Sequence, residues 1–283
     1  MPDFPIIDTH VHLWNVEKID YPWLGEVPPL NKTHRPEDFT QACGPVEVEG
    51  MIFLQADAEE EENHLEAQWV SHLAQHDPRI KGIVARASLE QGEAVRQDLD
   101  MLSQNPLVKG IRRLIQGETD PDFCLQYEFV QGVKMVHNYG MHFELCIYHH
   151  QLASVLKLVA QCPEVSFNLN HIGKPGIEDG LKDPWREEIA ALAEFDNMSC
   201  KISGMANEAD MQHWTDKDLR PYIHHVIEQF GFDRVMFGGD WPVSTLATDY
   251  PRWVNTVEQA VAGCSYTELR NLFVDNAKKF YRL

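Results

Sequence analysis

The sequence lacks any apolar run of about 18 residues, which is the length that a membrane-spanning helix needs. Its first residues, MPDFPIID, contain no basic segment followed by a long apolar stretch, so we expect no signal peptide and a cytoplasmic location. Cysteine is sparse: none of the six cysteines is paired at C-x-x-C spacing. This pattern predicts free, buried thiols in a reducing compartment.

Positive charge is also scarce. The chain has 24 lysines and arginines against 44 aspartates and glutamates, a formal net charge of −20. Such an acidic surface argues against nucleic acid and anionic membrane as partners. A small-molecule substrate is the expected partner, and the sequence leaves a homo-oligomer open.

Eight short apolar or β-branched runs recur along the chain, and most of the intervals between them have the apolar spacing of a helix. The runs cover 6–12, 48–57, 80–89, 108–115, 141–148, 165–173, 198–205 and 234–241. Helical patterns cover 62–76, 92–104, 127–139, 151–162, 184–195, 220–230, 251–263 and 266–281. Strand and helix alternating eight times predict a single α/β domain over 1–283, a distorted (β/α)8 TIM barrel.

The first interval, 13–47, is rich in proline and irregular, which predicts a long loop over the mouth of the barrel with a short helix near 36–43. A flavodoxin-like open sheet is the structural alternative. It would usually have fewer strands and a glycine-rich phosphate loop, and no such loop follows the first run.

Polar side chains able to bind a metal or transfer a proton stand at the ends of three of the predicted strands. In IIDTHVHLW, His10 and His12 are two residues apart and share one face of a strand. His171 ends the sixth strand in NLNHIGKP, and Asp240 ends the eighth in FGGDWP. Taken singly, each could be a surface, capping or hydrogen-bonded core residue. In a (β/α)8 barrel the carboxyl ends of the strands form one mouth, so the four are expected to converge there.

The blocks DTHVHLW, GIRRL, NHIGKP, KISGM and GGDWPV resemble, in that order, those of the amidohydrolase superfamily. They are most similar to its lactonase branch, which includes L-fuconolactonase, L-rhamnonolactonase and 2-pyrone-4,6-dicarboxylate lactonase. The resemblance covers nearly the whole chain. It implies a distorted (β/α)8 barrel and an enzyme that is a carboxylic-ester hydrolase, with a role in carbohydrate metabolism.

The resemblance also implies roles for matched positions. His10 and His12 match the histidine pair of the first strand, and His171 matches the histidine of the sixth. Asp240 matches the aspartate that acts as general base on the attacking water. Arg112, in GIRRL, matches a substrate-binding arginine. Some members need a metal and others do not, so a metal does not carry over automatically.

The residues themselves limit the kind of metal centre. Two-metal relatives use a lysine at the end of the fourth strand, whereas Lys109 stands at the start of that strand, so no binuclear centre is expected. Glu144 shares a strand face with His142 and is a candidate ligand or electrostatic partner. Three histidines with one or two carboxylates suit one divalent ion, zinc before others. The candidate ligands are His10, His12, His171, Glu144 and Asp240. The same residues serve catalysis without a metal, and the sequence leaves both schemes open.

The resemblance and these residues together predict hydrolysis of a sugar-acid lactone, with Asp240 and His171 as catalytic residues. Arg112, Trp14, Lys174 and Trp241 are the candidate substrate-binding residues, because guanidinium and ammonium groups bind polar groups and aromatic faces stack on sugar rings. Lys174 is equally a candidate surface lysine, and aromatic residues also simply cap barrels. His149 and His150 follow the fifth strand and are expected to be loop residues.

Two other functions compete with this prediction. A metal-dependent decarboxylase or hydratase of an unsaturated or aromatic acid would use the same histidine and aspartate set. A non-catalytic barrel that binds a small molecule would tolerate loss of Asp240 without losing ligand affinity. The sequence does not say which lactone is opened.

Overall fold

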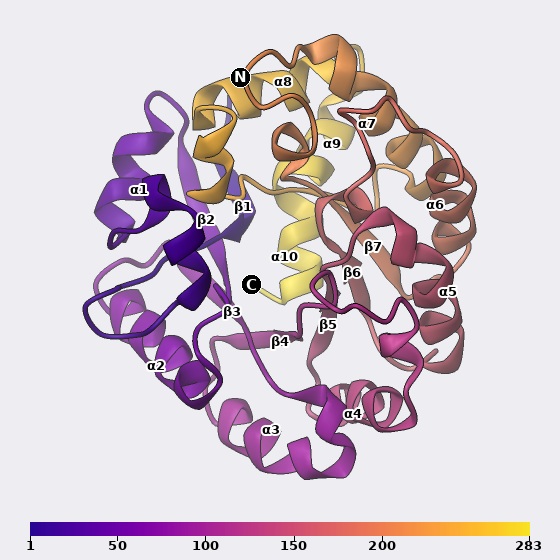
Figure 1. Ribbon diagram of the computed structural model, residues 1–283. Helices are drawn as coiled ribbons and strands as arrows, with labels where there is room; N and C mark the ends of the chain where they lie inside the picture. Colours follow the sequence, from indigo (N-terminus) through magenta and orange to yellow (C-terminus); the bar gives the residue numbers. More distant parts are fainter.

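Eight parallel strands form one sheet in chain order, β1 to β8 (Figure 1). The structure is a computed structural model that describes residues 1–283. Helices lie around the outside of the strands, so the predicted (β/α)8 barrel is confirmed. The strands are β1 Ile6–Val11, β2 Val48–Leu54, β3 Ile80–Ala85, β4 Val108–Arg112, β5 His142–Leu145, β6 Phe167–Leu169, β7 Met198–Ile202 and β8 Val235–Phe237.

Several strands are shorter than the apolar runs that predicted them. The run over 165–173 yields only three strand residues in β6, and the run over 234–241 only three in β8. Beyond these strands the backbone turns: His171 has φ 53° and Asp240 has φ 55°. A left-handed residue cannot continue a strand, so the polar ends of these runs become loops at the mouth of the barrel.

The helices occupy the predicted intervals. They are α1 Pro36–Cys43, α2 Asn63–Ala74, α3 Arg96–Ser103, α4 Tyr127–Asn138, α5 Leu152–Gln161, α6 Trp185–Ala193, α7 Asp216–Phe230, α8 Tyr250–Ala260, α9 Tyr266–Arg270 and α10 Asn276–Tyr281. The helix predicted from residue 92 begins later because Gly92 has φ 58°. The last predicted helix is divided by a wider, π-helical turn over Asn271–Asp275.

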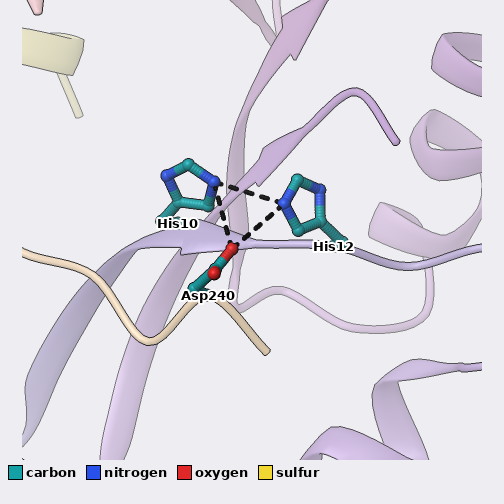
Figure 2. Close-up of side chains that lie close together, drawn as sticks. All are labelled: His10, His12 and Asp240. Carbon is teal, nitrogen blue, oxygen red and sulfur yellow. Dashed lines mark hydrogen bonds and ion pairs between the residues drawn. The ribbon is translucent and has the colours of Figure 1, made fainter. Parts of the chain in front are cut away.

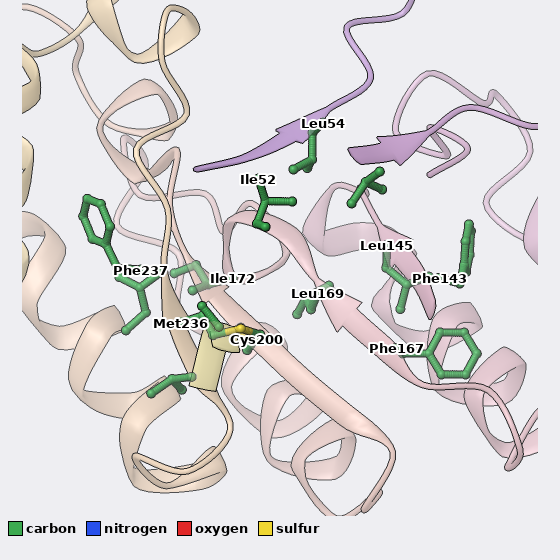
Figure 3. Close-up of a cluster of buried hydrophobic side chains, with 14 of the residues drawn as sticks. Ile52, Leu54, Phe143, Leu145, Phe167, Leu169, Ile172, Cys200, Met236 and Phe237 are labelled. Atoms are coloured by element: carbon green, nitrogen blue, oxygen red, sulfur yellow. The ribbon is translucent and has the colours of Figure 1, made fainter. Parts of the chain in front are cut away.

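The two faces of the strands differ in chemistry. On β5 and β6, Phe143 pairs with Phe167 and Glu144 pairs with Asn168. Phe143 packs against Phe129 of α4 with 6.1 Å between ring centroids. The side of the strands that bears Phe143 and Phe167 therefore packs against the surrounding helices (Figure 3). Because neighbouring residues of a strand point to opposite faces, the polar partners point into the barrel. Glu144 and Asn168 therefore place polar groups inside the barrel.

The seam between β8 and β1 is closed by the segment that follows β8. The amide of His12 donates to the carbonyl of Trp241, and the amide of Asp240 donates to the carbonyl of His10, both at 2.7 Å. These two bonds align the end of β1 with the residues after β8. The irregular seam thus brings Asp240 beside the histidines of β1.

The predicted loop over the mouth carries its own small core. Its apolar side chains pack with two residues after β2 in a cluster of seven buried residues: Trp14, Ile19, Tyr21, Leu24, Leu30, Ala56 and Ala58. The indole N–H of Trp23 donates to the carbonyl of Ala56 at 2.8 Å, which ties the loop to the end of β2. The loop is therefore a fixed wall at the rim.

The other end of the barrel is covered by the C-terminal helix. In Figure 1, α10 crosses the centre of the ring of strands. Asn276 donates to the carbonyls of Phe232 and Val235 at the start of β8, which places this helix at the amino ends of the strands. From there the hydroxyl of Tyr281 reaches Glu144 inside the barrel at 2.7 Å. None of the helices combines the length and the apolar character needed to cross a membrane.

Candidate active site

His10, His12 and Asp240 face one another at the mouth of the barrel (Figure 2). The Nε2 atoms of the two histidines are 3.2 Å apart, and Asp240 Oδ1 lies 3.5 Å from His10 Nε2 and 3.4 Å from His12 Nε2. All three side chains are buried. The convergence expected from the sequence is therefore present in the structure.

His171 lies next to this group from the turn after β6. Its Nε2 is 3.9 Å from Asp240 Oδ1, and its ring centroid is 4.4 Å from that of His10. Its Nδ1 contacts Ser203 Oγ at 2.9 Å. A Cβ at Gly204, which has φ +63°, would stand 2.4 Å from His171 Nδ1, so only glycine leaves room for the imidazole. The block KISGM carries both residues, and sequence reasoning assigned neither a role.

Asp8 is a further residue without an assigned role, although it begins the block DTHVHLW. Its Oδ1 accepts from the amides of Gly239 at 2.8 Å and His10 at 2.9 Å, and its Oδ2 accepts from Tyr250 Oη at 2.8 Å. A Cβ at Gly239 would lie 2.3 Å from Asp8 Oδ2. Burial raises the pKa of Asp8 to about 7. This side chain joins the start of β1 to the loop that carries Asp240.

Burial sets the protonation of the site. It lowers the pKa of His10 and His12, and it lowers that of His171 to about 3, so the three imidazoles are neutral at pH 7. Burial would raise the pKa of Asp240, but the neighbouring His171, His12 and Lys174 together lower it below its usual value. The site therefore combines one carboxylate with three neutral histidines.

The hydrogen-bond partners of the β1 histidines determine what their inner nitrogens offer. His12 Nδ1 lies 2.9 Å from the carbonyl oxygen of Leu54, which only accepts, so this nitrogen carries the proton and Nε2 has a free lone pair. Arg112 Nη1, which only donates, lies 3.4 Å from His10 Nε2. Both Nε2 atoms and Asp240 Oδ1 are thus acceptors that face one another, an arrangement that a cation between them would stabilise.

The spacing of these acceptors fits a small divalent ion. A tetrahedral zinc ion with ligand distances of about 2.0–2.1 Å keeps its ligand atoms about 3.3 Å apart. The three acceptor atoms are 3.2 to 3.5 Å apart, and nitrogen with carboxylate oxygen is a donor set that zinc accepts. The carbonyl of Leu54 orients His12 as the outer partners of metal-binding histidines usually do. His171 Nε2, 3.9 Å from Asp240 Oδ1, stands outside this group of three and is a more distant candidate ligand.

A cavity of about 230 Å³ opens beside these residues. Its wall includes His12, Arg112, His171, Lys174, Asp240 and Trp23. Arg112 is 3 % exposed, and its Nη2 donates to the carbonyl of Gln55. Lys174 Nζ lies 3.7 Å from Glu208 and 5.1 Å above the ring centroid of Tyr148. Two of the predicted substrate-binding residues therefore face the same space as the histidines.

The structure corrects the expectation for the other two, Trp14 and Trp241. Neither lines the cavity. Trp14 is fully buried in the loop core and donates to the carbonyl of Lys32 at 2.7 Å. Trp241 packs against His34 and Phe39, with 5.3 Å between ring centroids in each pair. The aromatic wall of the cavity comes from Trp23 instead.

Of the two roles that the sequence leaves open for Glu144, metal ligand and electrostatic partner, the contacts fit the second. Its Oε2 lies 2.5 Å from Lys201 Nζ and accepts from Asn170 Nδ2 at 2.7 Å. Its Oε1 accepts from Tyr281 Oη at 2.7 Å. Burial would raise the pKa of Glu144, but the charge and hydrogen bond of Lys201 together with His142 hold the pKa below its usual range. Glu144 therefore belongs to an ion pair inside the barrel.

Two remaining residues lie where the sequence placed them. Lys109 stands at the start of β4 and lines a separate pocket with Lys81 and Arg282. His149 lies in the turn after β5, where its Nδ1 contacts the carbonyl of Lys174 at 3.0 Å. That contact orients the loop bearing Lys174.

Comparisons with known proteins agree with this geometry. Residues 7–283 match the family model described as amidohydrolase. An uncharacterized protein, y4mH, of Sinorhizobium fredii is 31% identical over 300 residues and covers 100% of both chains. The L-fucono-1,5-lactonase of Burkholderia ambifaria is 26% identical over 98% of this chain and 95% of its own. The crystal structure of an amidohydrolase from Burkholderia multivorans with bound zinc has a TM-score of 0.88 and 25% identity, covering 99% of this chain and 100% of that one.

Proposed function

The chain belongs to the amidohydrolase family, and on that premise we propose that it hydrolyses the ring ester of a sugar-acid lactone. One observation carries the proposal. His10, His12 and Asp240 converge beside a small cavity that His12, His171 and Asp240 line, an arrangement suited to activating water against a carbonyl. The Burkholderia ambifaria relative, which carries a lactonase name, supports this choice of ester.

Asp240 is the general base in this scheme. Its carboxylate is ionised at neutral pH and is the acidic side chain closest to the histidines. Water attacks the carbonyl carbon as the Asp240 carboxylate takes its proton. The bond from that carbon to the ring oxygen then breaks, and the same proton passes to the departing oxygen as a hydroxyl. The product is a hydroxy acid, which releases one proton at neutral pH.

His10, His12, Asp240 and His171 are the residues that would hold a divalent ion. The fit of three facing acceptor atoms to one ion supports this assignment, as does the zinc in the Burkholderia multivorans structure. When bound, such an ion supplies Lewis-acid polarisation of a carbonyl and acidifies water. The protein's part is to keep the histidines neutral and oriented, through burial and through the contacts of Leu54 and Ser203.

The cavity supports a small, polar substrate. Its volume of about 230 Å³ is below the range of about 300–1,000 Å³ that is usual for sites of drug-sized ligands. Arg112 and Lys174 offer donors for hydroxyl and carboxylate oxygens, and Trp23 offers an aromatic face. A single sugar ring with several hydroxyl groups matches this combination better than a long apolar ester.

A pH-indicator screen of aldonolactones, including L-fucono-1,5-lactone, tests the proposal. Proton release is followed in weak buffer with and without a chelator, against the spontaneous hydrolysis of each lactone. We expect acceleration for at least one lactone and a loss of rate after chelation. No acceleration for any lactone would contradict the proposal. Release of CO2 from an aromatic or unsaturated acid would point to the decarboxylase alternative instead.

A further inference from the structure

A fully buried ion pair spans the inside of the barrel. Lys201 of β7 and Glu144 of β5 have no exposed surface, and Nζ lies 2.5 Å from Oε2. Removing two charges from water is costly, and apolar residues of similar volume often stabilise a protein as well or better. A contribution to folding stability is therefore a weak explanation for the presence of this ion pair. Neither residue lines the cavity, so neither contacts the substrate.

One oxygen of Glu144 links the pair to the residue before His171. Oε2 accepts from Lys201 Nζ and also from Asn170 Nδ2 at 2.7 Å. The other oxygen, Oε1, serves Tyr281 at 2.7 Å and His142 at 3.2 Å. The two carboxylate oxygens of Glu144 thus have different hydrogen-bond partners: Oε1 faces the C-terminal helix, and Oε2 faces Asn170.

The bond to Glu144 decides which end of the Asn170 amide faces the active site. A carboxylate only accepts, so the NH2 group of Asn170 must point toward Glu144. The carbonyl end, Oδ1, then faces Arg112, whose Nη1 lies 3.3 Å away. A guanidinium only donates, so this is the one orientation of the amide that bonds to Arg112. If the Asn170 amide were flipped, its NH2 group would face the N–H groups of Arg112, and no hydrogen bond could form between them.

We propose that Lys201 and Glu144 are positioning residues that act through Asn170 to fix Arg112 in the wall of the cavity. Lys201 balances the charge of Glu144, Glu144 orients Asn170, and Asn170 with the Gln55 carbonyl holds the guanidinium. The inference rests on the proposed function in one respect, that Arg112 contacts the substrate.

The test replaces the pair with apolar side chains of similar size, Glu144→Leu with Lys201→Met. The double variant leaves no unpaired charge in the barrel. We expect KM for the hydrolysed lactone to rise about 10-fold, as loss of a hydrogen bond to a charged group implies, with kcat little changed. A merely structural defect would lower the active fraction, and hence kcat, and leave KM unchanged.

Two further variants make the test specific. Asn170→Leu keeps the ion pair and removes the acceptor for Arg112. It should therefore raise KM as much as the double variant does. Combining all three substitutions should raise KM no further, because they break the same chain of contacts. Tyr281→Phe is the matched control, because it removes a partner of Oε1 and leaves Oε2 untouched. Its KM should equal that of the wild type.

Crystal structures of the wild type and the double variant supply a readout that needs no substrate. We expect the Arg112 guanidinium to leave Asn170 in the variant. If no lactone is hydrolysed, the proposed function fails, and the position of Arg112 still tests the positioning pair. An unmoved Arg112, or an unchanged KM in Asn170→Leu, overturns the proposal. Asn170→Leu keeps the test open should the double variant not fold.

Discussion

The carboxylate of Asp8 accepts a hydrogen bond from the backbone amide of Gly239 at 2.8 Å, although 231 positions separate the two residues. The same carboxylate accepts from the amide of His10. Gly239 precedes Asp240, so the Asp8 side chain positions both the strand that leads to His10 and His12 and the loop that bears Asp240. The first and last blocks of the sequence are joined at this point.

Replacing Asp8 with alanine should therefore weaken both the fold and the catalysis. The change leaves buried donors on Gly239, His10 and Tyr250 without an acceptor. We expect urea unfolding to show a loss of about 1–3 kcal/mol or more, with a lower kcat. Tyr250→Phe removes one donor and no acceptor, and serves as the control. A variant Asp8→Ala as stable as Tyr250→Phe would disprove the role of Asp8.

Zinc binding tests directly whether His10, His12 and Asp240 form a metal site. We expect the wild type to retain about one zinc ion per chain. His12→Gln should lower zinc affinity by at least ~100-fold, more than loss of an outer partner usually costs. Competition with a chromophoric chelator measures this affinity. His213→Gln is the control, because the His213 side chain is 77% exposed and far from the cluster in sequence. Equal affinity in His12→Gln and the wild type would rule out the assigned ligand set.

Lys174 should contribute to substrate binding more than to turnover. It lines the cavity and is held by Glu208 and the ring of Tyr148. For Lys174→Met, steady-state kinetics should show a KM raised about 10-fold, because a hydrogen bond from a charged group is lost. The exposed Lys182 offers a matched substitution, Lys182→Met, which should leave KM unchanged. An unaltered KM in Lys174→Met would remove this residue from the substrate site.

Glu66 should make stability depend on pH. It is buried under the rim loop, its Oε1 accepts from the amide of Ala56 at 2.9 Å, and burial raises its pKa from 4.5 to about 8. A carboxyl with a raised pKa stabilises the folded state below pH ~4.5, and this contribution is lost as the pH rises through about 8.

Glu66→Gln keeps an oxygen for Ala56 and does not titrate. Its free energy of unfolding should therefore rise relative to the wild type between pH 5 and pH 8.5, by more than ~1.4 kcal/mol, the value of one pKa unit. Urea titrations at the two pH values measure the difference. A difference that does not change with pH would show that Glu66 does not titrate in the folded protein.

Much of the barrel could be predicted because its signal is local. Alternating strand patterns and helical stripes depend only on neighbouring residues, and His10 stands on such a strand with His12 directly after its end. His171 and Asp240 could be placed because every parallel strand of a barrel ends at the same mouth. The left-handed backbone at His171 and Asp240, in contrast, has no signature in the apolar pattern. The sequence therefore predicted longer strands than β6 and β8.

The missed features depend on contacts between distant segments. Lys201 alternates with apolar residues on β7 as any half-exposed strand residue would, and only closure of the barrel brings it to Glu144. The choice between Trp14 and Trp23 as the aromatic wall depends on which face of the rim loop packs inward. That packing has no period in the sequence, so the sequence could not show that Trp23 lines the cavity and Trp14 does not.

The most direct test of the account is the rate of proton release from L-fucono-1,5-lactone, or from the best lactone of the screen, with the wild type and with Asp240→Asn. The variant keeps the size of the side chain and loses the base. If Asp240 takes the proton from water, kcat falls by at least ~100-fold while circular dichroism and melting show an intact fold. A variant that hydrolyses the lactone at the wild-type rate would contradict the central claim.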